Sequence, residues 1–541
     1  MTMQKKRIVI LGGGFGGVYA ARVMEKILKP EEASIKLVNR ENYWVYQPML
    51  PEVISGSIGI TDVVSPIRHL CSRTQLVMRE VEEIDLKKKV VILSPGFRPR
   101  RLEIPYDYLV IALGGVTNFY GMPGMIEHAK PFRTLADAIA LRNHLIHALE
   151  EADVETDLEL RRRLLTFVVA GGGFSGVEVM AELNDFVRSV KCKYHKLRNE
   201  TARCVLVHSG DRILPEMTDG LALFAQKILR GRGVEIVLQD RLAAATSEKA
   251  VFKSGMEVSC KTIVSTVPSA LAPVLQRLEC TKEKGRLKVN SAMELEGYEG
   301  EVWAVGDCAT ARTVKGTVVP PTAQHATRAA KTVALNVAAA MHGESAKHFD
   351  FEGLGTLGAL GHYSAVANIM GVHLSGFPAW FMWRFIYLTK MPGFNRKVRI
   401  GLDWLSALLF SPDLVQLRVP KESSVSRQHF EPGEIVFNEG DLGDNVYVVD
   451  KGHCEVTRGA NGAEEHIADL ADGDYFGEMA VLADISRNAT VRAITPLDVL
   501  LIPRNDFNQL KTAVPAFGAV FRELAERRQA AAAGEAATVR R

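Results

Sequence analysis

The sequence lacks several features that would each point to a particular class of protein. Its seven cysteines are scattered and none stands at CxxC or CxxxxC spacing, so we expect neither a disulfide framework nor a local redox dithiol. No uninterrupted apolar stretch reaches about 18 residues, which argues against a membrane-spanning helix. The net charge is only +3 over 541 residues, so we expect no nucleic-acid partner, and we expect no metal site.

A cleavable leader is not expected either. Lys5, Lys6 and Arg7 run directly into the apolar strand pattern 8–11, and the first chemical motif follows that strand at once. Hydrophobic content of 47% and charged content of 24% are ordinary for a globular protein. The length predicts three or four domains.

The first motif is a glycine-rich turn between a strand and a helix. Gly12, Gly14 and Gly17 give GxGxxG spacing, in which the glycines allow a tight turn, a close approach of backbone to pyrophosphate, and packing of helix on strand. The second strand, 35–38, ends in Asn39 where an acid would hold the adenosine ribose, and Glu41 is an alternative partner. The sequence therefore predicts a dinucleotide site with an amide in place of the acid.

The same arrangement recurs later in the chain. Gly171, Gly173 and Gly176 again lie between a strand and a helix, which predicts a second dinucleotide or a duplicated half. The following strand, 204–207, ends in His208 rather than an acid. Since a carboxylate there would repel a 2′-phosphate, NADPH is expected to be tolerated beside NADH; a solvated turn residue is the alternative interpretation of His208.

A third signal is a strand, 301–305, that ends in Gly306-Asp307. In flavoproteins with paired cradles such an aspartate reaches the ribityl chain of FAD beside the first cradle. The FAD domain is therefore predicted to be discontinuous, with the nicotinamide domain inserted in it. The fold class is α/β, with two Rossmann-like domains.

Together these residues resemble a type II NADH dehydrogenase, over roughly residues 7–419. The resemblance extends through the flavin-side loop 42–53, the segment 112–124, and Thr134-Leu135-Ala136-Asp137. It implies flavin contacts from Phe15, Arg40, Gln47, Ala112 and Gly114 as well. It places Glu178 where nicotinamide meets flavin; a helix first-turn acid that complements the dipole is the alternative.

The quinone motif of that family is half present. The family has the pattern AQxAxQQ, and residues 323–329 of this chain read AQHATRA. Gln324 matches the first glutamine, and Arg328 stands where the second is expected. A quinone is the expected acceptor, with an altered head-group preference or a different acceptor left open.

Residues 377–410 mix aromatic and basic side chains, a composition typical of a bilayer interface. We expect this segment to lie on the membrane surface, on the cytoplasmic side, without spanning it. The same aromatics would also suit a buried homodimer interface, which remains the alternative.

After about residue 421 the sequence changes to short alternating strands and resembles a cyclic-nucleotide-binding domain, a β-barrel. Segment 477–491 matches its phosphate cassette: Gly477 opens it, Glu478 matches the ribose-binding glutamate and Arg487 the arginine that pairs with the cyclic phosphate of cyclic AMP or cyclic GMP. Asn488 replaces a small residue and Ser486 replaces a proline. The alternative is a retained barrel that binds nothing.

These observations predict the domains 1–130 and 291–345 for FAD, 131–290 for NAD(P)H, 346–420 for membrane and acceptor, 421–528 for the cyclic nucleotide, and a tail, 529–541. The predicted function is an FAD-dependent NADH:quinone oxidoreductase that does not pump protons and is regulated by a cyclic nucleotide. A reductase of a soluble acceptor and a non-catalytic flavin or nucleotide sensor are the two rival hypotheses.

Overall fold

A computed structural model describes residues 5–96, 100–119, 122–266, 269–417, 426–459, 465–483 and 485–513. The predicted tail, 529–541, lies outside these residues. The chain divides into two compact units, residues 1–91 with 105–418, and residues 92–104 with 419–541. Each unit is described by itself.

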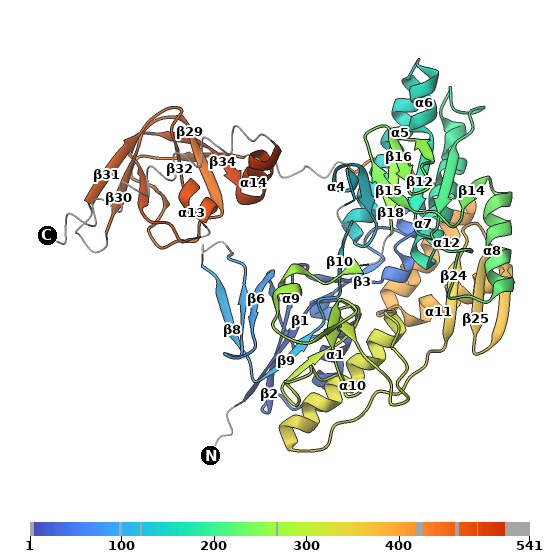
Figure 1. Cartoon of the computed structure of the whole chain (residues 1–541), viewed down its shortest axis with the longest axis horizontal. Helices are drawn as coiled ribbons and strands as arrows, with labels where there is room; N and C mark the ends of the chain where they lie inside the picture. Colours follow the sequence, from blue (N-terminus) through green and yellow to red (C-terminus); the bar gives the residue numbers. More distant parts are fainter. Residues whose placement is uncertain are drawn as a thin grey trace. The chain divides into compact units, whose positions relative to one another are not determined.

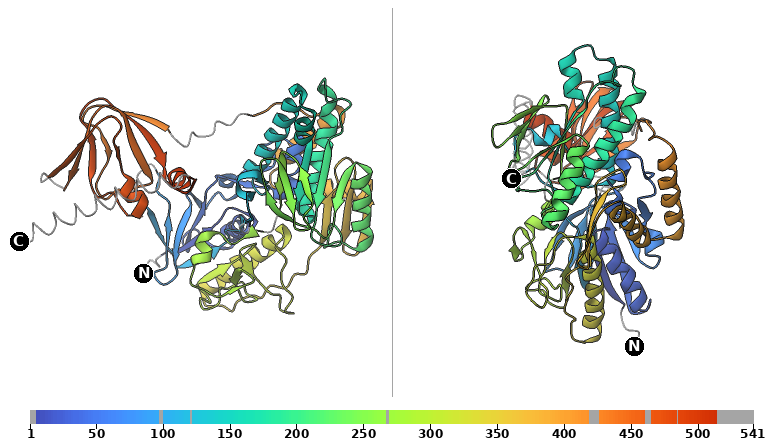
Figure 2. Two further views of the ribbon diagram at one scale, coloured as in Figure 1. Left: turned by 45° about the horizontal axis from the view of Figure 1, so that its top comes forward. Right: turned by 90° about the vertical axis from the view of Figure 1, so that its right-hand side faces the viewer.

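The first unit contains a five-stranded parallel sheet built from two distant parts of the chain (Figure 1). Its strand order is β22 (Val302–Ala304), β9 (Tyr108–Ile111), β1 (Lys6–Leu11), β2 (Ala33–Asn39) and β5 (Gln75–Met78). The apolar half of β1 is fully buried, as a strand covered on both faces must be. Helices α1 (Phe15–Ile27) and α10 (Ala323–His342) pack against each other, and Figure 2 shows the pair from two further directions.

A second parallel sheet of five strands lies in the same unit. Its order is β11 (Ala129–Pro131), β18 (Thr262–Ser265), β12 (Thr166–Ala170), β13 (Arg203–Val207) and β14 (Val234–Val237). The helices connected to it are α5 (Leu135–Val154), α6 (Leu158–Leu164), α7 (Phe174–Val190) and α8 (Asp219–Gly231). Thr134 and Asp137 form a capping box at the start of α5, which satisfies two of its free N–H groups.

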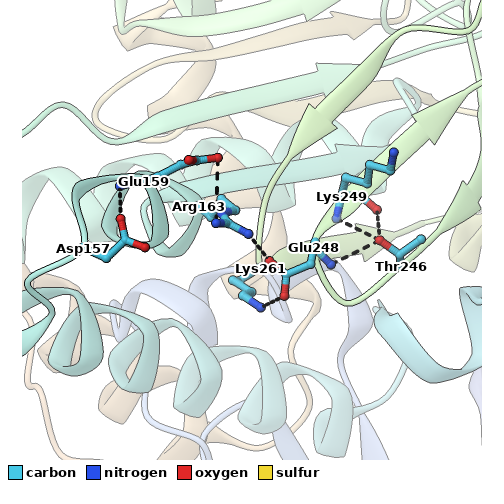
Figure 3. A network of polar contacts seen from close by, with 7 residues as sticks. All are labelled: Asp157, Glu159, Arg163, Thr246, Glu248, Lys249 and Lys261. Carbon is cyan, nitrogen blue, oxygen red and sulfur yellow. Dashed lines mark hydrogen bonds and ion pairs between the residues drawn. The ribbon is translucent and has the colours of Figure 1, made fainter.

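A small antiparallel sheet shares an apolar core with one face of this second sheet: β15 (Leu242–Ala245), β16 (Lys249–Phe252) and β17 (Glu257–Ser259). A polar network ties it to α6 (Figure 3). In it Arg163 lies between Glu159 and Glu248, and Glu248 also pairs with Lys261. Shared, partly exposed charges of this kind hold an element in place rather than supply much stability.

The remaining strands of the first part of the chain are short. They are β3 (Tyr43–Val45), β4 (Val64–Pro66), β6 (Val81–Asp85), β7 (Val90–Leu93), β8 (Leu102–Pro105), β10 (Val116–Thr117), β19 (Ser269–Ala270), β20 (Lys282–Glu283), β21 (Arg286–Lys288) and β23 (Ala309–Thr310). The short helices are η1 (Gln47–Met49), α2 (Glu52–Ser55), α3 (Ile67–Leu70), α4 (Met125–His128), η2 (Lys191–Lys193) and α9 (Pro273–Arg277).

The first unit ends in an antiparallel sheet and two helices. The sheet is β24 (Gly355–Ala359), β25 (Ala365–Ile369) and β26 (Val372–Gly376), and α11 (Phe377–Lys390) packs on all three strands. Helix α12 (Phe394–Leu409) follows after a short turn. Among the residues described, no helix is both long enough and apolar enough to cross a bilayer.

The second unit holds two four-stranded antiparallel sheets, orange to red in Figure 1. One is β27 (Ser426–Phe430), β34 (Leu497–Pro503), β29 (Asn445–Lys451) and β32 (Tyr475–Phe476); the other is β28 (Ile435–Phe437), β33 (Thr490–Ala493), β30 (Cys454–Arg458) and β31 (Glu465–Leu470). Residues from both sheets, such as Val449 and Val491, share one apolar core. Helices α13 (Glu478–Ala483) and α14 (Arg504–Ala513) complete the unit.

Candidate active site

The first glycine-rich turn has the geometry of a phosphate cradle. Gly12 has a φ of +104°, a conformation that L side chains rarely adopt, and a Cβ at Gly17 would overlap the carbonyl oxygen of Gly12. At Gly14 the same construction meets no atom within 4 Å. The middle glycine therefore borders open space at the start of α1, where N–H groups and the helix dipole favour an anion.

Asn39 occupies the end of β2 and ties down the turn. Its Oδ1 accepts from the N–H of Gly13 at 2.8 Å, and its Nδ2 donates to the carbonyl of Glu41 at 2.8 Å. Arg40 points to the surface, where it pairs with Glu80 at 3.6 Å. The amide that replaces the expected acid thus stabilises the turn, and each of its polar atoms keeps one further hydrogen-bonding position.

Asp307 lies at the carboxyl end of β22, the strand that joins the first sheet from beyond the second domain. Its Oδ2 pairs with Nη2 of Arg133 at 2.9 Å, and both side chains are about one-third exposed. Arg133 is absent from the sequence prediction, since no local motif marks it. This ion pair joins the carboxyl end of β22 in the first sheet to the residue that precedes the capping box of α5.

The other residues assigned to the flavin surround this edge. The backbone of Ala112 contacts Gly12 closely, Gly114 has a φ of +64° with open space around it, and Phe15 packs edge-on against Trp44 at 4.9 Å. Gln47 is an exposed residue at the start of η1. These positions are compatible with one extended ligand along the carboxyl ends of β1 and β9.

The second cradle repeats the first. Gly171 has a φ of +120°, and a Cβ at Gly176 would overlap the carbonyl oxygen of Gly171. Gly173 has only the carboxylate of Glu216 near it, at 3.9 Å from the Cβ position. The two turns therefore have the same open middle position and the same closed third position, as a repeated dinucleotide fold requires.

His208 has the role in this cradle that Asn39 has in the first. Its Nδ1 accepts from the N–H of Gly172 at 3.1 Å, and burial lowers its pKa below the ordinary value. An imidazole that accepts through Nδ1 is neutral and keeps its proton on Nε2. Arg212 is paired with Asp219. Neither side chain is therefore placed as a free cation for a 2′-phosphate.

A buried acid cluster lies on the amino-terminal half of α7, the helix that follows the second cradle. Glu178 is 9% exposed, and its Oε1 accepts from the N–H of Ala359 at 3.0 Å. Burial, with a smaller contribution from the nearby Glu52 carboxyl, raises the pKa of Glu178 to about 8. Burial also raises the pKa of Glu182, one turn later on the same face. These two carboxyls carry protons at neutral pH.

Glu52, on α2, links this cluster to the C-terminal helices. Its carboxyl lies 3.4 Å from Arg384 and accepts from the indole N–H of Trp404 at 3.2 Å. The guanidinium of Arg384 sits between two indoles, 4.2 Å from the ring of Trp380 and 4.5 Å from that of Trp404. Charge, cation–π contact and hydrogen bond together fix α11 and α12 to the acid cluster.

This arrangement corrects part of the sequence prediction for residues 377–410. Trp383 and Trp404 are buried and Arg384 is nearly so, so these side chains hold the helices to the rest of the first unit rather than face a bilayer. The exposed apolar side chains are a different set, which we call the docking face: Phe377, Phe381, Phe385, Phe394, Val398, Leu402, Leu405, Leu408, Leu409 and Phe410. The sequence pattern combined the two faces because aromatic residues occur on both.

Gln324 begins the half-preserved quinone motif on α10, and both ends of its amide are engaged. Nε2 donates to the carbonyl of Gly355 at 3.0 Å, and Oε1 accepts from the N–H of Leu354 at 3.1 Å. Arg328, one turn on, stacks its guanidinium 4.0 Å over the ring of Phe351. Gln324 therefore positions the chain that enters β24, while Arg328 brings a cation where the family has an amide.

The cassette of the second unit has its charged residues buried. Arg487 is 4% exposed; it donates to the carbonyls of Gly477 at 2.5 Å and Asn445 at 2.7 Å, and stacks 4.1 Å from the ring of Phe437. Glu478, at the start of α13, is buried, and Asn488 contacts the sulfur of Met479 at 3.5 Å. An incoming phosphate would have to exchange for the two carbonyls that Arg487 now binds.

Comparison with known proteins gives three family matches. The pyridine nucleotide-disulphide oxidoreductase profile matches residues 6–330, the NDH2 C-terminal domain profile residues 354–413, and the cyclic nucleotide-binding domain profile residues 427–513. These ranges follow one another along the chain and cover both units.

Individual proteins match over most of their length. The type II NADH:quinone oxidoreductase Ndh of Mycobacterium tuberculosis is 30% identical over 445 residues, which is 79% of this chain and 93% of that protein. The demethylphylloquinone reductase NdbB of Synechocystis is 29% identical over 416 residues, or 75% and 97%. Among solved structures, NDH2 from Plasmodium falciparum in complex with NADH has a TM-score of 0.70 at 18% identity, covering 76% of this chain and 100% of that one.

Proposed function

The chain belongs to the type II NADH:quinone oxidoreductases within the pyridine nucleotide-disulphide oxidoreductase family, and we propose that it oxidises NADH through bound FAD and reduces a quinone. The observation that carries the proposal is the pair of matching cradles in one compact unit. FAD, when bound, would supply the hydride-accepting and electron-donating chemistry.

The residues of the first cradle fit FAD. Gly14 leaves open space for a pyrophosphate, Asn39 offers its remaining hydrogen-bonding positions to a ribose, and Asp307 lies where the second segment of the chain returns to the first sheet.

The residues of the second cradle fit NADH. Because His208 is neutral and Arg212 is paired, tolerance of NADPH depends on the absence of a carboxylate at position 208 rather than on a waiting cation.

Glu178 is the group of this chain that we assign to proton handling. Reduction of a quinone by NADH gives quinol and NAD⁺ and takes up one proton from solution. With a pKa of about 8, Glu178 holds a proton at neutral pH and can release it only to a strong acceptor nearby. Gln324 acts as a positioning residue, since its amide holds the segment that contains Leu354 and Gly355.

The docking face supports attachment to a membrane surface, which we propose to be the cytoplasmic one. On α12 its members follow helical spacing, from Phe394 through Val398, Leu402 and Leu405 to Leu409, and Phe394 is 79% exposed. Exposed apolar rows of this length are unusual on a protein that meets only water. A helix pair lying in the interface would place the acceptor site beside a pool of membrane quinone.

A soluble acceptor is the second candidate function, and one observation favours it. Arg328 replaces the second glutamine of the quinone motif and stacks on Phe351, so the acceptor site is more cationic than that of the family. Arg328→Gln distinguishes the two acceptors: it should raise turnover with a soluble quinone analogue if quinone is the acceptor, and leave it unchanged or lower it if an anionic soluble acceptor is preferred.

The direct test is spectroscopic. Purified protein should carry a flavin absorbance band that NADH bleaches without oxygen and that a quinone analogue restores. Protein that lacks the band, and does not recover it with added FAD, would disprove the proposal.

We further propose that the second unit is a cyclic-nucleotide-binding β-barrel that alters the rate of NADH oxidation, because its cassette retains Glu478 and Arg487.

A further inference from the structure

A cavity of about 730 Å³ opens beside the turn between α11 and α12 and is not used by the proposed reaction. It shares no lining residue with either cradle or with the acid cluster. Its walls come from α1, from α3 with the strand before it, and from the turn around Gly393. All of these belong to the first unit.

The charges around this cavity, which we call the basic pocket, have one sign. Four cations line it, Arg22, Lys390, Arg396 and Arg399, together with His69, and no acidic residue does. Arg396 is neutralised by Asp62 at 3.0 Å, and Arg399 lies 3.8 Å from the same carboxylate. Within the described ranges of the chain, no carboxylate stands in ion-pair distance of Arg22 or Lys390. Two cations therefore face the pocket without a counter-charge, which favours an anionic occupant.

The start of α12 adds to this field. The helix begins at Phe394 with no side-chain cap and no acid in its first turn, so its free N–H groups are left to solvent or to a ligand at the pocket. A sixteen-residue helix has a developed dipole, and its positive end lies among the cations already named.

The pocket is continuous with the docking face. Phe394 lines the pocket and is also the first member of the exposed apolar row on α12. An occupant with a charged head and an apolar tail would satisfy both parts at once: the head among Arg22 and Lys390, the tail along Val398 and Leu402. A free phosphate would fill only a small part of the volume and would leave the apolar row uncovered.

We propose that the basic pocket binds the phosphate head group of an anionic phospholipid, a proposal that rests on the membrane attachment argued above. The bound lipid would anchor α12 at its amino-terminal end while the apolar row enters the acyl region. Binding would then depend on the charge of the lipid, and not on the apolar face alone.

The test compares two double variants of the full-length, flavin-loaded protein. Arg22→Gln with Lys390→Gln removes two charges from the pocket; Lys227→Gln with Lys331→Gln removes two exposed charges elsewhere in the same unit. Vesicles of phosphatidylcholine alone and vesicles with added phosphatidylglycerol are the probes. Wild type and the control should prefer the anionic vesicles, and the pocket variant should lose about 10- to 30-fold of that preference. NADH oxidation with a soluble quinone should be the same in all three.

A second measurement separates this proposal from membrane attachment itself. Monomeric short-chain phosphatidylglycerol and inorganic phosphate are titrated into each protein and followed by calorimetry. Binding of the short-chain lipid to wild type but not to the pocket variant supports the pocket even if no vesicle binds. Equal lipid binding by both variants would overturn it, and phosphate binding as tight as the lipid would make the site a phosphate site instead.

Discussion

The raised pKa of Glu178 makes stability depend on pH in a way that one substitution should remove. In the unfolded chain this carboxyl ionises near pH 4.5, whereas in the folded protein burial holds its proton until about pH 8. Between these values the folded state binds one more proton than the unfolded state. Stability therefore falls as pH rises through this window, and the fall ends above the folded pKa.

The size of the effect follows from the same values. Each pH unit well inside the window costs about 1.4 kcal/mol, and the slope halves as the folded pKa is reached, so Glu178 alone should remove about 2 kcal/mol from wild type between pH 6 and pH 8. Glu178→Gln has no proton to lose, keeps nearly the same shape, and retains an oxygen for the N–H of Ala359. The variant should therefore gain on wild type steadily over this range and not below about pH 4.5.

The assay is thermal unfolding of the flavin-loaded protein at a series of pH values, followed by flavin fluorescence. The difference in Tm between Glu178→Gln and wild type should widen by a few degrees from pH 6 to pH 8 and then level off. Glu31→Gln, at an exposed position, is the control and should show a constant difference. A constant difference for the Glu178 variant as well would mean that this carboxyl is already ionised at pH 6, and the assignment of its proton would be wrong.

Three further predictions concern the ligand sites. Gly14→Ala should lower the flavin content without changing the Tm of the apoprotein, because its Cβ meets no protein atom, whereas Gly17→Ala should lower both; equal effects would refute the cradle geometry. His208→Glu should raise the KM for NADPH about tenfold or more with little change for NADH, by repulsion of the 2′-phosphate; if wild type already rejects NADPH as strongly, His208 does not decide the preference. Arg487→Ala should abolish the calorimetric heat of cyclic AMP or cyclic GMP and leave basal NADH oxidation intact, and heat that survives the substitution would place the phosphate elsewhere.

The sequence determined the parts of this protein that depend on the backbone. Gly12 and Gly171 adopt a positive φ, and a Cβ atom at Gly17 or Gly176 would overlap a carbonyl oxygen of the same turn. Only glycine meets either requirement, so the spacing of the glycines alone marks both cradles. The flanking apolar runs identify the strands and helices for the same local reason. The family resemblance rests on these segments, and the family profiles match them.

Only the tertiary structure decided the contacts between distant segments. Glu52 and Trp404 are separated by 352 positions, and Arg133 and Asp307 by 174, yet each pair forms one hydrogen-bonded unit. No local pattern predicts such pairs, because they depend on which helix faces pack together. The same is true of the aromatic residues after position 377: composition groups Trp383 with Phe381, but helical phase buries the first against the dehydrogenase and leaves the second on the surface.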